Sequence, residues 1–146
     1  LECLKEAGYL YSSSVYPIRH DHYGMPDAPR FAFNPLTRSE FLEMPVTTFE
    51  FMNMKLPCGG GGYFRLLPYP ISKFAMKRVN ENDEEACIFY FHPWEIDPDQ
   101  PRQHNASLKS KFRHYTNLDV MEKKIERLLV DFRWGRMDDV FLRRND

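Results

Sequence analysis

A histidine at the end of an apolar run is the residue best suited to acid–base chemistry. The run ACIFYFH (residues 86–92) ends in His92, and Pro93 cannot continue a strand. A buried strand that stops here would place the imidazole at the carboxyl edge of a sheet, where α/β folds assemble active sites. Because an imidazole titrates near neutrality, His92 could protonate a leaving group, with Trp94 walling the site and Glu95 holding a cation or supporting a neighbour. The alternative is a hydrogen-bonded core histidine.

A second polar cluster, RHDHYG at residues 19–24, contains the ligand types of a metal site. His20 and His22 would share one face of a strand, with Asp21 between them. Zinc sites usually take ligands from separated segments, so a third ligand would have to come from elsewhere. We therefore predict no metal ligand in this chain and expect His20 and Asp21 to line a substrate groove. A small metal hydrolase centred on His20 and His22 is the alternative.

Four consecutive glycines at residues 59–62 precede Tyr63 and Arg65. They are neither followed by Lys-Ser or Lys-Thr nor spaced as GxGxxG, which argues against a phosphate-binding loop. Two interpretations remain. The run is a flexible turn between strands, or it lines a polysaccharide groove and presents Tyr63 and Arg65 to it.

Helices and strands alternate in the prediction, which indicates the α/β class. One helix is predicted to end at Gly8, and three others are predicted to cover 70–79, 106–115 and 118–132. The predicted strands lie within 9–16, 41–57, 86–92 and the tail 134–141. In the helix of 70–79, an apolar face is expected from Ile71, Phe74, Ala75 and Val79.

The helix of 118–132 has the clearest amphipathic pattern, and its Lys124 is expected to face water. At the other end of the chain, no capping residue precedes Leu1 and no initiator methionine is present. We therefore expect the chain to be part of a longer protein.

The composition is that of one globular domain of 146 residues, with 42% hydrophobic and 28% charged residues. A net charge of −1 argues against nucleic acid as a partner, since binding phosphates requires a basic face.

The chain has three cysteines, which lie far apart in the sequence and form no CxxC pair, so neither a zinc site nor a disulfide framework is predicted. No apolar run reaches the length of a transmembrane helix, about 18 residues or more. The aromatic content of 15% indicates exposed rings, which carbohydrate sites use.

Four stretches carry a resemblance to a known family: LKEAGYLYSSSVYPIRHDHYGMPDAPR, GGGYFRLLPY, FYFHPWEIDPDQPR and SLKSKFRHYTNLDVMEKKIERLLVDFRWGRMDDVF. They resemble the C-terminal half of bacterial polysaccharide deacetylases of the NodB type (carbohydrate esterase family 4), in the branch associated with exopolysaccharide and exosortase gene clusters. The similarity covers nearly the whole chain. It implies a single domain over residues 1–146, the C-terminal part of a distorted (β/α) barrel with a helical extension from residue 106.

The resemblance also implies a chemistry, the hydrolysis of N-acetyl groups on polymer sugars. Members of the family hold a divalent metal, usually zinc, with an aspartate and two histidines, and a second aspartate activates water. A late histidine then protonates the departing amine, and His92 matches it by position. The metal residues would lie upstream of Leu1, so the metal is expected in the full-length protein and not in this chain alone. Relatives often carry an aspartate where this sequence has Ser12, so Asp21 or another carboxylate would have to replace it, or the acid is weaker.

The resulting hypothesis is the C-terminal portion of a polysaccharide deacetylase, with His92 as general acid and His20, Asp21, Tyr63, Arg65 and Trp94 in the substrate groove. A bacterial cytoplasmic or envelope location is compatible with it. Severed barrel strands would leave open sheet edges, so self-association is also expected. The runner-up is a carbohydrate-binding or scaffolding module without catalysis.

Overall fold

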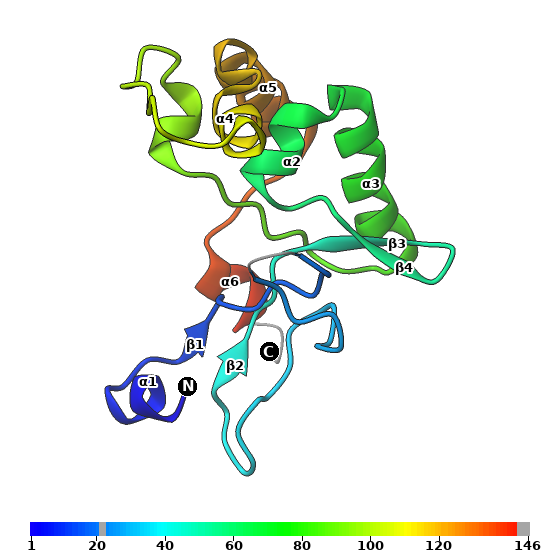
Figure 1. The fold of residues 1–146 in the computed structure, drawn as a ribbon. Helices are drawn as coiled ribbons and strands as arrows, with labels where there is room; N and C mark the ends of the chain where they lie inside the picture. The colour runs from blue at the N-terminus through cyan, green and yellow to red at the C-terminus, as the bar shows by residue number, and fades with distance from the viewer. Residues whose placement is uncertain (21–22, 143–146) are drawn as a thin grey trace. The chain divides into compact units, whose positions relative to one another are not determined.

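The computed structural model describes residues 1–20 and 23–142 (Figure 1). It is 40% helical and 11% strand, with small sheets, which confirms a mixed helix and strand class. The barrel stays a prediction. The chain divides into two compact units, one formed by residues 1–59 and 76–89 and the other by residues 60–75 with the chain from 90 onward.

The first unit begins with helix α1 (Glu2–Glu6), which ends as the sequence predicts at Gly8. Gly8 has φ +86°, the left-handed conformation that glycine adopts without a steric cost. Its N–H donates to the carbonyl of Lys5 (2.9 Å), and the N–H of Tyr9 donates to the carbonyl of Leu4 (3.0 Å). These two bonds are a Schellman motif, which satisfies the last carbonyls of the helix.

Two small sheets follow in this unit. Strand β1 (Tyr11–Ser12) pairs in parallel with β2 (Leu42–Glu43), and β3 (Thr48–Phe51) pairs antiparallel with β4 (Met54–Pro57). The turn between β3 and β4 consists of Met52 and Asn53, both with positive φ, as a two-residue hairpin of type I′ requires. The strands predicted within 9–16 and 41–57 are therefore confirmed, with β2, β3 and β4 dividing the second range.

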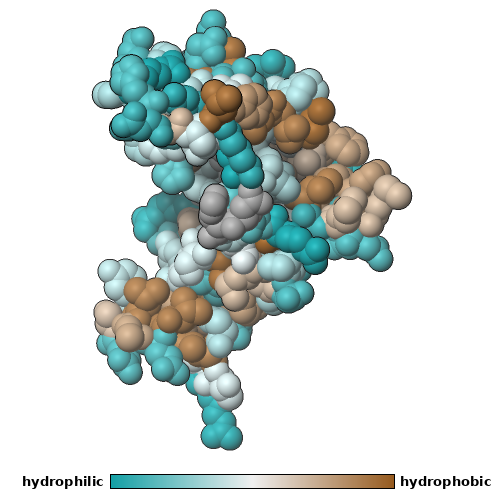
Figure 2. Space-filling model, in the orientation of Figure 1, coloured by the Kyte–Doolittle hydropathy of each residue, from teal (hydrophilic) through white to brown (hydrophobic). Residues whose placement is uncertain are grey.

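The β3–β4 hairpin carries large apolar side chains on its outside. Phe51, Met52, Met54 and Leu56 are all exposed, Met52 by 78%. Figure 2 shows apolar residues on the surface where Figure 1 places this hairpin. Self-association through this or any other surface stays a prediction.

The strand predicted for residues 86–92 does not form, so this prediction was wrong. The segment forms separate contacts with the rest of the chain. The N–H of Ile88 donates to Oγ1 of Thr47 (2.6 Å), and Tyr90 forms an isolated bridge with Gly60. Phe91 is 37% exposed. A strand buried in a sheet needs a hydrogen-bonded neighbour along each edge, and in the described structure the backbone bonds of this segment to Thr47, Gly60 and Gly61 do not form a continuous ladder.

The second unit is helical. It contains α2 (Gly61–Leu66), the first half of α3 (Tyr69–Asn82), the 3-10 helix η1 (Pro93–Ile96), α4 (Leu108–Tyr115), α5 (Leu118–Asp131) and α6 (Met137–Phe141). Its buried apolar side chains include Phe64, Leu118, Met121 and Leu128, which come from α2 and α5. The three long predicted helices are therefore confirmed as α3, α4 and α5.

Three details of the predicted elements differ from the structure. Ile71 and Phe74 on α3 are exposed by 50% and 57%, while Ala75 and Val79 are buried as expected. The glycine run is not a loop up to Arg65, because α2 begins at Gly61. The tail predicted as a strand is helix α6, whose first turn carries Asp138 and Asp139, residues that favour the positive end of a helix dipole.

Candidate functional site

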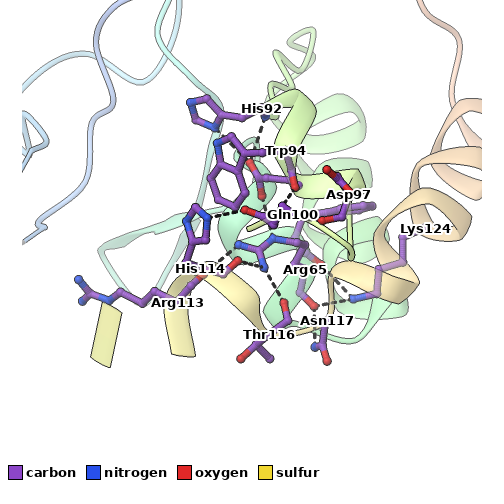
Figure 3. Close-up of polar contacts among 12 residues, drawn as sticks. Arg65, His92, Trp94, Asp97, Gln100, Arg113, His114, Thr116, Asn117 and Lys124 are labelled. Atoms are coloured by element: carbon purple, nitrogen blue, oxygen red, sulfur yellow. Dashed lines mark hydrogen bonds and ion pairs between the residues drawn. The ribbon is translucent and has the colours of Figure 1, made fainter. Parts of the chain in front are cut away.

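A buried ion pair lies at the centre of the second unit. Arg65 of α2 donates through Nε to Oε2 of Glu95 in η1 at 2.9 Å, and the two side chains are 1% and 2% exposed. A buried charge is tolerated only with a partner and with its remaining hydrogen-bonding groups satisfied. Both conditions are met here, and Figure 3 shows the polar contacts around Arg65.

The other nitrogens of Arg65 bind the C-terminal end of α4. Nη1 donates to the carbonyls of His114 (3.2 Å) and Thr116 (2.5 Å), and Nη2 donates to that of Arg113 (2.9 Å). Helix-terminal carbonyls have no partner within their own helix, and a cation is favoured near them. Arg65 therefore joins α2, η1 and the end of α4 in one network.

The second oxygen of Glu95 holds His92. Oε1 accepts from the backbone N–H of His92 (3.1 Å) and lies 3.2 Å from its ring atom Nδ1. A carboxylate paired with Arg65 can only accept, so Nδ1 carries the hydrogen, and Nε2 is the ring nitrogen left for other chemistry. The side chain of His92 is 56% exposed. This geometry gives an oriented imidazole with access to solvent.

Aromatic rings stack beside this imidazole. The Trp94 ring lies 4.0 Å from the His114 ring with an interplanar angle of 16°, and 5.6 Å from the His92 ring with an angle of 19°. The guanidinium of Arg65 lies 5.4 Å from the Trp94 ring, within the range of a cation–π contact. Trp94 therefore contacts both histidines and the buried cation.

Gln100 holds His114 against this stack. Its amide nitrogen donates to the carbonyls of Trp94 (2.8 Å) and Asp97 (3.0 Å), so its oxygen is the atom that accepts from Nε2 of His114 at 2.7 Å. Burial, together with the charge of Arg65, lowers the pKa of His114 below the ordinary histidine value. The ring is therefore neutral at pH 7 with its hydrogen on Nε2.

Lys124 of α5 does not face water as the sequence predicts. Its Nζ donates to the carbonyls of Phe64 (3.1 Å), Arg65 (2.8 Å) and Leu67 (2.9 Å). Burial, and then the nearby charge of Arg65, lowers its pKa. The apolar spacing of α5 puts Lys124 on the polar face of the helix, which is why the sequence predicts that it is solvated. Its side chain is long enough to reach the carbonyls at the end of α2, which have no partner within that helix.

Two adjacent glycines of α2 differ in the space around them. A Cβ added to Gly61 would lie 2.6 Å from Oε1 of Glu95 and 2.7 Å from Cβ of Phe91, whereas one added to Gly62 would meet nothing within 4 Å. We expect Gly61→Ala to destabilise the protein by about 1–3 kcal/mol, because η1 and its Glu95 must move. Gly62→Ala should be neutral or stabilising by up to about 1 kcal/mol, because alanine favours a helix. Urea unfolding of both variants measures the difference, and equal stabilities would contradict the packing.

The structure brings together three of the predicted site residues, His92, Trp94 and Arg65. Arg65 is buried in the network rather than presented by a loop. Tyr63 lies half-buried on α2. His20 belongs to the other compact unit, where its ring stacks on Tyr23 at 3.9 Å, and Asp21 lies outside the described residues.

Two residues of this site, His114 and Gln100, were not predicted from the sequence. Glu95 was named, but Arg65 was not identified as its partner. The spacing of His92 and Glu95 within FHPWE was a local signal for their contact. Nothing in the sequence linked Arg65 to Glu95, which is 30 residues away, or His114 to Trp94.

Metal ligands do not converge in the described part of the chain. Among residues 1–20 and 23–142, no group of three or more His, Cys, Asp or Glu side chains could hold a metal ion. The described residues therefore do not fit the metal that the deacetylase resemblance implies. The same residues contain no helix long and apolar enough to cross a membrane.

Comparison with known proteins identifies a family. Residues 13–142 match the family described as "Domain of unknown function (DUF3473)". No curated protein and no solved structure matches the chain. Because the match covers most of the sequence, the chain belongs to the DUF3473 family.

Proposed function

We propose that the chain is the C-terminal portion of a metal-dependent polysaccharide deacetylase, with His92 as the acid that protonates the departing amine. The contact between Glu95 and His92 is the observation that carries this proposal. It holds the proton of Nδ1 inside the protein and leaves Nε2, on a ring 56% exposed, for a substrate. When the ring is protonated on both nitrogens, Nδ1–H stays with Glu95 and the proton on Nε2 is the one that a substrate can take, as a general acid requires.

The reaction would be hydrolysis of an N-acetyl group on a sugar. Water adds to the acetyl carbonyl and gives a proton to a base that we propose to lie upstream of Leu1. The C–N bond then breaks, and the nitrogen takes a proton from Nε2 of the doubly protonated ring of His92 as acetate leaves. His92 takes up a proton again before the next turnover. The products are acetate and the free amino sugar. No step is assigned to a metal here, because the described residues do not fit one; its ligands are proposed to lie upstream of Leu1.

The buried ion pair supports the acid indirectly. Arg65 binds Oε2 of Glu95 and anchors it to the carbonyls at the end of α4, so Oε1 of Glu95 is left for His92. We therefore propose Arg65 as a positioning residue. Trp94 remains a proposed wall of the groove, and Tyr63, His20 and Asp21 remain proposed substrate contacts.

The experiment is an assay of the full-length protein with oligomers and polymers of N-acetylglucosamine, in which released acetate is measured. We expect acetate release that depends on an added divalent metal. Sugar binding by calorimetry without acetate release would instead indicate a carbohydrate-binding or scaffolding module. The parent gene gives a second check, because an upstream sequence without an Asp-Asp pair and a His-x-x-x-His motif would contradict the enzyme.

A further inference from the structure

The Trp94 ring is held between two imidazoles that differ in their surroundings. His92 is 56% exposed, whereas His114 is half-buried and bound through Nε2 to Gln100 at 2.7 Å. Figure 3 shows the three rings following one another from His92 through Trp94 to His114. The rings are nearly parallel, with interplanar angles of 19° and 16°. A change at His114 should therefore reach His92 through Trp94.

The position of His114 is fixed by contacts on several sides. Its backbone carbonyl accepts from Arg65, its Nε2–H donates to Gln100, and its ring forms a T-shaped pair with that of Tyr115, with centroids 4.6 Å apart. Aromatic pairs at such distances contribute about 0.5–1.5 kcal/mol beyond the area they bury. The ring of His114 is therefore a rigid support for one side of Trp94.

We propose that His114 is a positioning residue for the acid imidazole, and that it acts through the face of Trp94. The inference rests on the proposed function, since it assigns His114 to the orientation of His92 during proton transfer. Glu95 fixes the position of Nδ1 in His92, but one hydrogen bond leaves the ring free to turn about it. The stack on Trp94 and the T-shaped contact with Tyr90 restrain that rotation, and His114 restrains Trp94.

The charge state of His114 agrees with this role. The groups that act on it electrostatically are Arg65 and Arg102, which disfavour its protonation, and Glu95, which favours it. Burial is the largest cause that lowers its pKa, and the two arginines act in the same direction. A neutral ring stacks on Trp94 without adding a second cation beside Arg65.

Two substitutions separate the contacts of His114. Gln places an amide nitrogen near the position of Nε2 and keeps the bond to Gln100, but it removes the ring. Phe keeps the ring and removes the bond. We expect His114→Gln to lower the kcat of acetate release by about 10-fold with KM little changed, because a misplaced acid slows the chemical step. His114→Phe should keep kcat within about 3-fold of the parent, because the stacked pair is retained.

A double substitution tests the path through Trp94. We expect Trp94→Leu to lower kcat at least as much as His114→Gln, and the combined variant to be no slower than Trp94→Leu alone. His104→Gln, the same change at an exposed histidine of the linker, is the matched control and should leave kcat unchanged. Circular dichroism gives the folded fraction, to which each kcat is normalised.

Three outcomes would overturn the inference. An active parent protein with unchanged kcat in His114→Gln would remove His114 from the mechanism. Effects of His114→Gln and Trp94→Leu that multiply in the double variant would show that His114 does not act through Trp94. A folded, metal-loaded parent protein that releases no acetate would overturn the proposed function, and this inference with it.

Discussion

Replacing His92 with alanine in the full-length protein should lower the turnover of N-acetylated oligosaccharides by about 10²–10⁴-fold. The departing amine would then have to take its proton from water, which is not oriented. Substrate binding and metal content should change little, because in the described structure the ring of His92 contacts Glu95, Trp94 and Tyr90 and is otherwise open to solvent. Steady-state kinetics of acetate release give the turnover and the KM, and metal analysis gives the metal content.

The control for this variant is His104→Ala, which removes an exposed imidazole from the linker before α4. It should retain the parent's turnover. Turnover that is the same in His92→Ala and His104→Ala would exclude His92 as the acid. A loss of bound metal in His92→Ala would mean that the residue acts as a ligand rather than as a proton donor.

Replacing Arg65 with methionine should destabilise the protein by about 3–5 kcal/mol, the usual effect of removing one partner of a buried ion pair. Methionine fills much of the same volume, but it leaves the side chain of Glu95, which is 2% exposed, without its partner. It also leaves the carbonyls of Arg113 and Thr116 without the guanidinium that binds them. The free energy of unfolding in urea measures the effect.

Arg136→Met is the matched control for Arg65→Met. Arg136 also forms an ion pair, with Asp138, but its side chain is 77% exposed. An exposed pair of this kind contributes at most about 1 kcal/mol. If the two variants lost the same stability, the buried network would not be the support that holds the second unit together.

Helix positions were predictable because helices form through local interactions. The predicted ranges 70–79, 106–115 and 118–132 correspond to α3, α4 and α5, and Gly8 ends α1 with the expected positive φ. In each case the signal lies within one or two turns of the residue concerned, in its apolar spacing or its capping chemistry. Neighbours distant in sequence were not needed.

Strands were less predictable because their partners lie elsewhere in the chain. The apolar run at 86–92 has the composition of a buried strand, but in the described structure its bonds to Thr47 and its bridge to Gly60 do not make it a strand of a sheet. Composition alone cannot tell whether a neighbour is present. The short tail was assigned to a strand for the same reason, although its local charges favour α6.

The same distinction between local and distant interactions applies to the candidate site. The sequence by itself determined that a histidine, a tryptophan and a glutamate follow an apolar run within four residues, and this was enough to propose His92 as an acid. Only the tertiary structure decided that Arg65 is the buried partner of Glu95, that Lys124 binds the end of α2, and that His114 stacks on Trp94. The physical reason is that a buried charge must find its partner in space, and the number of residues that separate two such groups along the chain does not limit which of them meet.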